Sequence, residues 1–230
     1  MHQDRKTAVI TGALFLLTEV AAVAGLLLYQ PLLDGREGAG QRALSGALAE
    51  IVLVTAVVGT ATALHPVLSR RSAAAAHAYL AGRLLEGAVI AVGILAVLTL
   101  VTLPQQPGPA RELLTALHAR TFLLGPNVAL GLNTTVLAYA LHRARLLPRP
   151  ITVLGLLGGP LILASAVAVL FGAYQQVSAA GSLAALPVLA WELALAVHLL
   201  ARGFKEPQPM SSGSTRIFTE SGGRSATRAI

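Results

Sequence analysis

The sequence contains no cysteine and is poor in aromatic and charged side chains, which make up 4% and 12% of its 230 residues. The lack of cysteine excludes disulfide bonds, a thiolate nucleophile and every metal site that uses cysteine. Soluble globular proteins carry a charge on roughly 25% of their residues. So few charges, together with 55% hydrophobic residues and a mean hydropathy of +0.70, are typical of a chain that lies largely within a membrane.

Six apolar stretches follow one another, with short polar segments between them. The hydrocarbon core of a bilayer is about 30 Å thick and takes roughly 20 apolar residues per helical crossing. The sequence therefore predicts an all-α, polytopic membrane protein with six transmembrane helices in one bundle, at residues 7–29, 43–68, 77–103, 113–141, 151–173 and 183–200. We expect residues 1–204 to form this domain and residues 205–230, which are polar and rich in Ser and Gly, to form a disordered cytoplasmic tail.

The first apolar stretch has a competing interpretation, a cleaved signal peptide. A basic head at Arg5 and Lys6 leads to Ala22-Val23-Ala24, which is similar to a cleavage site. Two features favour a spanning helix instead. The apolar run continues to Leu28, and Glu19 would interrupt the hydrophobic region of a signal peptide.

Basic residues are distributed unevenly between the two sides that the six spans define. Because cytoplasmic loops of membrane proteins hold the excess of Lys and Arg, we expect a protein of the cell (inner) membrane with both termini in the cytoplasm. Twelve basic residues then lie on the cytoplasmic side and three on the other, the three being Arg36, Arg42 and Arg111. These residues sit in short segments, so the net charge of +7 indicates contact with the lipid bilayer and no nucleic-acid partner.

Ionisable side chains within the predicted spans are the clearest sign of a functional site. One such group at a helix centre costs about 2.5–3.5 kcal/mol on insertion scales, so each needs a partner, a water-filled cavity or a function. The embedded carboxylates exceed the guanidinium groups by two, and we expect at least one glutamate to be protonated, to reach water or to meet a cation. These residues are Glu19, Glu50, Glu86 and Glu192 against Arg83 and Arg120.

Two helices carry polar side chains at helical spacing. In the third span, Arg83 and Glu86 are three residues apart and can pair, either as a self-neutralising pair or facing a cavity. In the fourth, Arg120, Asn127 and Thr134 recur every seven residues and should share one face. These polar groups either hydrogen-bond neighbouring helices or line a site.

Proline 126 lies within the fourth span and predicts a kink there. We predict a shared polar interior between the third, fourth and sixth spans in which Arg120 pairs with an embedded glutamate. The candidate ligand-binding residues are Glu86, Arg83, Arg120, Glu192, Asn127, Glu50 and Glu19.

Motifs of known chemistry are missing from the sequence. It has no G-x-S-x-G elbow, no H-E-x-x-H pair and no phosphate-binding loop after a strand, so no catalytic residue is predicted. A bis-histidine haem needs facing histidines at matched depth, whereas His118 lies nearer the outer side than His65, His77 and His198. We predict no cofactor and no metal site, although the three inner histidines could coordinate a ligand near the cytoplasmic surface.

Four segments resemble a bacterial family of membrane proteins, the one defined by domain of unknown function number 4386. They are TGALFLL (residues 11–17), RLLEG (83–87), FLLGPNVALGLN (122–133) and LPVLAWEL (186–193). Their order and spacing, more than any one string, carry the resemblance. It implies a six-helix membrane protein and supplies no activity or site residues, and Glu19 is not a feature associated with the family.

Three functions are compatible with the sequence. The polar residues on several spans favour a membrane protein that binds a small ligand or ion, including a transporter. A structural or regulatory membrane partner, in which polar residues only join helices, is the main alternative, and a membrane-embedded enzyme using a glutamate is the third. These functions differ in the arrangement of four charged residues, which either surround one cavity or pair within a closed bundle. The four are Arg83, Glu86, Arg120 and Glu192.

Overall fold

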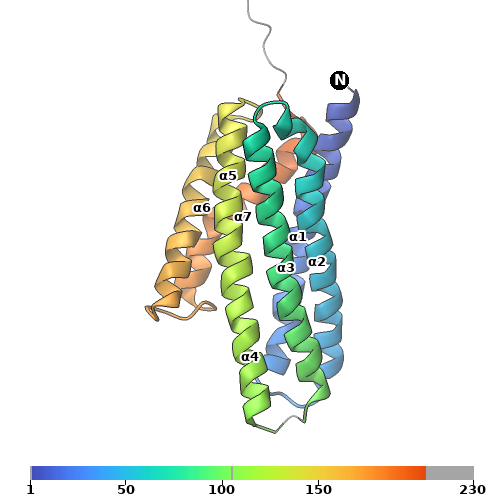
Figure 1. Ribbon diagram of the computed structural model, residues 1–230, viewed down its shortest axis with the longest axis vertical. Coiled ribbons are helices and arrows are strands. Elements are labelled where there is room, and N and C mark those ends of the chain that lie inside the picture. Colours follow the sequence, from blue (N-terminus) through green and yellow to red (C-terminus); the bar gives the residue numbers. More distant parts are fainter. Residues whose placement is uncertain (1, 105, 206–230) are drawn as a thin grey trace, which may run out of the picture.

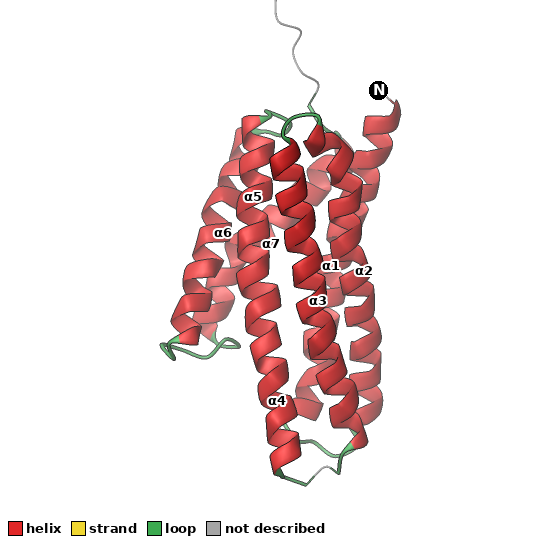
Figure 2. Cartoon of the chain, viewed as in Figure 1, coloured by secondary structure: helices red, strands yellow, loops and turns green. Residues whose placement is uncertain are grey.

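The computed structural model describes residues 2–104 and 106–205, and the predicted tail lies outside them except for its first residue. All regular secondary structure in the described residues is helical (Figure 2). The elements are α1 (His2–Leu33), α2 (Gly40–Ser69), α3 (Ala73–Thr102), α4 (Pro109–Phe122), the π-helix η1 (Leu123–Ala129), α5 (Leu130–Arg143), α6 (Arg149–Leu170) and α7 (Ala179–Ala201).

These elements form six spans, because α4, η1 and α5 make one continuous helical segment from Pro109 to Arg143. Each of the six is long and apolar enough to cross a membrane. The predicted all-α bundle of six transmembrane helices is confirmed. Its helices begin and end within about five residues of the predicted bounds, and the largest difference is the start of the first helix at His2.

The six spans are arranged as a closed ring. Each span packs on its neighbours in sequence, and α1 also packs on α7, which closes the ring (Figure 1). The contacts of α3 with the fourth span involve α4, η1 and α5. With six antiparallel crossings, the start of α1 and the end of α7 lie at the same end, which we call the terminal end (Figure 1).

The surface of the bundle is apolar and its interior contains charged groups, the reverse of a soluble protein. Large hydrophobic side chains such as Val20, Leu85 and Leu157 are 60–68% exposed on its outside. Arg83 and Glu86, in contrast, are 2% and 3% exposed. Lipid accommodates such a surface and water does not, so the chain is a multi-pass membrane protein.

The spans differ in length. Helices α6 and α7 contain 22 and 23 residues, whereas α1, α2 and α3 contain 30 to 32. At 1.5 Å per residue the short pair is about 33 Å long, close to the thickness of the hydrocarbon core. The longer helices continue beyond the short pair at the end opposite the terminal end (Figure 1).

The irregularity predicted at Pro126 takes the form of the π-helix η1. Proline has no amide hydrogen and its ring clashes with the carbonyl group one turn earlier, so a regular α-helix cannot continue through it. A π turn contains an extra residue and therefore rotates every later side chain around the helix axis. This rotation decides which residues of α5 face the interior.

Candidate functional site

Arg83 is the centre of a buried network of polar side chains within the ring. Its Nη1 donates to both carboxylate oxygens of Glu86 over 3.2 Å, and its Nη2 donates to Oε1 of Glu192 over 3.1 Å. Its Nε donates to the hydroxyl of Tyr79 over 3.0 Å. The predicted pairing of Arg83 with Glu86 is present, and α7 adds a second carboxylate to the same guanidinium group.

Asn133 of α5 forms a further hydrogen bond with Glu86. Its Nδ2 donates to Oε2 of Glu86 over 2.7 Å, and Asn133 is itself buried. Gly82 makes room for this amide, because a side-chain carbon at Gly82 would overlap Asn133 Oδ1. Glu86 therefore accepts hydrogen bonds from its own helix and from α5.

Glu19 brings a third carboxyl group into this network from α1. Glu19 is half-buried and lies near Glu192, whereas the ion pairs of Arg83 are with Glu86 and Glu192. The rings of Phe15 and Tyr79 flank the guanidinium group of Arg83, with centroids 5.6 Å and 5.4 Å from its central carbon. Aromatic faces attract such a cation and keep water from it.

We call Glu19, Arg83, Glu86, Asn133 and Glu192 the interior cluster. Its members come from α1, α3, α5 and α7, which are four of the six spans. Two carboxyl groups, those of Glu86 and Glu192, contact one guanidinium group, and the half-buried Glu19 lies near Glu192, so the fully ionised cluster would carry two uncompensated negative charges. Burial makes such an excess costly, and bound protons or another cation would remove it.

Arg120 does not belong to this cluster, and its predicted pairing with an embedded glutamate is wrong. Its side chain is exposed, and it lines a surface hollow of about 380 Å³ together with Tyr174 and Gln175 of the connection between α6 and α7. An exposed charge of this kind needs no buried partner.

The predicted common face of Arg120, Asn127 and Thr134 is also wrong. Arg120 is exposed, Asn127 is half-buried and Thr134 is buried without a hydrogen-bond partner for its hydroxyl group. Seven-residue spacing keeps side chains on one face only in a regular α-helix, and η1 lies between these positions. The extra residue of the π turn brings Asn133 to the interior in place of Asn127.

The family comparison covers most of the chain. The model for the domain of unknown function DUF4386 matches residues 10–203. The chain belongs to this family. No curated protein and no solved structure shows significant similarity to it.

The DUF4386 segment contains the whole interior cluster. Arg83 and Glu86 lie in the RLLEG string, Asn133 ends the GPNVALGLN string, and Glu192 lies in LPVLAWEL. Three of the four strings that resemble the family thus meet at one point in the ring. Glu19 lies just after the remaining string, one turn beyond Phe15.

Glu50 forms a second polar group within the DUF4386 bundle, away from the interior cluster. It is 7% exposed and lies beside Tyr29 of α1. A narrow hollow next to it is lined by Gly93 of α3 and by His118 and Thr121 of α4. The ring of His118 also packs edge-on against Tyr29, with centroids 5.4 Å apart.

The inner histidines are less closely gathered than the sequence suggested. The rings of His65 and His77 lie 5.3 Å apart near the terminal end. Within the described residues, no three His, Asp or Glu side chains are close enough together to hold a metal ion.

Proposed function

We propose that this protein binds protons at the interior cluster and that both of its ends lie in the cytoplasm. The observation that carries the proposal is that the buried carboxylates of Glu86 and Glu192 share the guanidinium group of Arg83, with Glu19 half-buried near Glu192. Arg83 can balance one of these carboxylates. The remaining excess favours a bound cation in the middle of the membrane.

A proton fits this place better than a larger cation. Glu86 and Glu192 are 3% and 5% exposed, and both already accept hydrogen bonds from Arg83. Two neighbouring carboxyl groups, such as Glu19 and Glu192, repel each other strongly when both are ionised. One proton held between them converts that repulsion into a hydrogen bond, as in other carboxyl pairs.

The second polar group supports a role in moving protons. Glu50 packs against Gly25 of α1, six residues after Glu19. Along a helix this is about 9 Å, so the two carboxyl groups lie at successive depths of the same bundle. Chains of Glu and His within membrane spans are typical of proton pathways in pumps and transporters. We therefore favour a proton-coupled transport function over a purely structural one.

The alternative is a structural or regulatory partner, and one observation favours it. Arg83 uses Nε, Nη1 and Nη2 in hydrogen bonds within the bundle, as an arginine that only joins helices would do. In that case the cluster would keep one protonation state at all accessible pH values. The two functions therefore differ in whether the cluster titrates.

The test is infrared spectroscopy of the full-length protein in lipid vesicles. A protonated buried carboxyl group has a carbonyl stretch that is distinct from carboxylate bands and shifts in heavy water. We expect this band to change with pH in the wild type and to diminish in Glu19→Gln and Glu192→Gln. Glu112→Gln is the matched control, because Glu112 is exposed in the first turn of α4.

A band that is absent from the wild type, or equally strong in all three variants, would refute proton binding at the cluster. Vesicles that contain a pH-sensitive dye test transport separately. Proton leak across them should fall in Glu19→Gln and not in Glu112→Gln. A titrating cluster without any flux would favour proton-dependent regulation over transport.

A further inference from the structure

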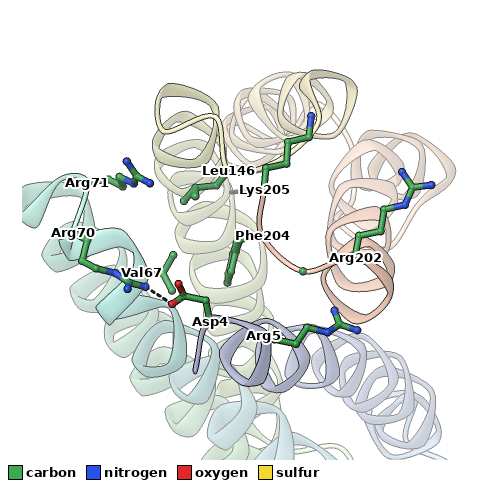
Figure 3. A pocket seen from close by; sticks show the side chains of 10 residues that line it. Asp4, Arg5, Val67, Arg70, Arg71, Leu146, Arg202, Phe204 and Lys205 are labelled. Carbon is green, nitrogen blue, oxygen red and sulfur yellow. Dashed lines mark hydrogen bonds and ion pairs between the residues drawn. The ribbon is translucent and has the colours of Figure 1, made fainter. Parts of the chain in front are cut away.

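We propose that the hollow at the terminal end of the bundle is a binding site for a phosphate-bearing anion. The hollow has a volume of about 760 Å³ and lies between the start of α1, the turn from α2 to α3, the connection from α5 to α6 and the end of α7 (Figure 3). Small-molecule sites typically occupy 300–1,000 Å³. The site is separate from the interior cluster and shares no residue with it.

Positive charge dominates the walls of this hollow. Five of its residues are basic and one is acidic, and their side chains come from segments up to 200 positions apart in the sequence (Figure 3). Guanidinium groups bind phosphate oxygens through paired hydrogen bonds, and lysine adds a point charge. The basic residues are Arg5, Arg70, Arg71, Arg202 and Lys205, and the acidic residue is Asp4.

Two of the five basic side chains already have partners. Arg5 donates to the carbonyl oxygens of Leu199 and Leu200 over 3.1 Å and 2.7 Å, where it caps the end of α7. Arg70 pairs with Asp4. Among the described residues, Arg71, Arg202 and Lys205 take part in no ion pair. These three charges are available to an anion.

Membrane topology alone does not require this arrangement. Basic residues gather at the cytoplasmic ends of spans in most membrane proteins. Arg145 and Arg149 do so here without lining this hollow. Topology depends on the number of charges near each span and not on whether they line one hollow, as these five basic residues do.

The walls are also fixed in place and partly apolar. The backbone amide of Lys205 donates to the carbonyl of Leu146 over 2.9 Å, which holds the segment after α7 against the connection between α5 and α6. Val67 and Leu146 are buried and Phe204 is half-buried in the wall. An apolar portion next to phosphate matches an organic phosphate in solution and the headgroup of an anionic phospholipid alike.

The experiment measures binding of pyrophosphate to the full-length protein in nanodiscs made of phosphatidylcholine. Isothermal titration should show saturable binding to the wild type. Affinity should fall at least tenfold in the double variant Arg71→Gln/Arg202→Gln. The matched control, Arg145→Gln/Arg149→Gln, removes the same charge from the same end and should stay within twofold of the wild type. Because Arg71 and Arg202 are exposed, we expect the first variant to fold, and the two single variants replace it if its melting temperature falls.

A second arm identifies the source of the phosphate. Nanodiscs that contain phosphatidylglycerol should compete with pyrophosphate if the natural ligand is a lipid headgroup, and should leave its affinity unchanged if the ligand is soluble. Phosphatidylglycerol that remains bound to the wild type and to the control, but not to the Arg71/Arg202 variant, would support the lipid even without pyrophosphate binding. No saturable binding of either anion, or an equal loss in both double variants, would overturn the proposal.

Discussion

The guanidinium group of Arg83 connects α3 to α7 by a hydrogen bond of 3.1 Å to Glu192, which lies 109 positions later in the sequence. Replacing Arg83 by Gln leaves carboxyl groups from two helices without their cation. Removing one partner of a buried ion pair typically costs about 3–5 kcal/mol. We expect a loss of this size in the free energy of unfolding, measured by denaturant titration in detergent, and partial recovery in Arg83→Lys because lysine lacks the planar fork.

Arg120→Gln is the control for this prediction, since it removes the same charge from an exposed position of α4. Exposed substitutions usually change stability by less than about 0.5 kcal/mol. If Arg120→Gln were as damaging as Arg83→Gln, the placement of Arg120 outside the interior cluster would be wrong.

Gly82 and Asn133 should behave as one unit. A methyl group at Gly82 would overlap Asn133 Oδ1, so Gly82→Ala must displace the amide that donates to Glu86 over 2.7 Å. Hydrogen bonds to charged groups are worth about 1.5–3 kcal/mol, and we expect Gly82→Ala and Asn133→Ala each to lose about that much. The double variant should lose no more than Asn133→Ala alone, because the clash is then absent. Additive losses in this double-mutant cycle would contradict the contact.

Gly159 is a close-approach point between α5 and α6. A side-chain carbon there would lie 2.8 Å from the carbonyl oxygen of Gly131 and 2.9 Å from the amide nitrogen of Thr135. Both atoms belong to the backbone and cannot rotate away, so Gly159→Ala should force the helices apart. Overpacking of this kind costs about 1–3 kcal/mol, measured as a lower melting temperature in detergent. Gly108→Ala is the matched control, because Gly108 has extended backbone with no atom within 4 Å, and it should melt like the wild type.

Reporter fusions test the proposed orientation. Twelve Lys and Arg residues against three favour a cytoplasmic terminal end. Fusions after Arg71 and after Arg149 should therefore show cytoplasmic activity, and fusions near Arg36 and Gly108 should show external activity. The reverse pattern at either pair would overturn this orientation and, with it, the cytoplasmic location of the phosphate site.

The spans could be predicted from the sequence because each follows from local composition. A run of about 20 apolar residues has few alternatives to a membrane helix. The partnership of Arg83 with Glu86 was equally local, since residues three apart on a helix are neighbours. The contact of this pair with Glu192 was only partly predictable. The cost of burying a charge in lipid required the carboxylates to face the interior, but the prediction did not pair Glu192 with Arg83.

The fourth span was predicted less well, and the reason is the π-helix. Pro126 indicated an irregularity in the helix, but the sequence did not show that the helix would contain an extra residue there. The prediction assumed regular α-helical periodicity across η1. It therefore placed Arg120 and Asn127 in the interior of the bundle and missed Asn133. Asn133 could have been found by analysing the sequence after Pro126 as a separate helix. Within α5, Asn133 is the only residue with an amide side chain.

The closure of the ring by α1 and α7 also has a consequence for how the protein is made. Spans enter the membrane in order, so Arg83 and Glu86 arrive while Glu192 is still unsynthesised. At about 5–20 residues per second, the 109 residues between Arg83 and Glu192 correspond to a wait on the order of ten seconds. During that interval Arg83 has the partners that α1 and α3 supply, and the carboxylate three residues along its own helix keeps it from entering the bilayer as a lone charge.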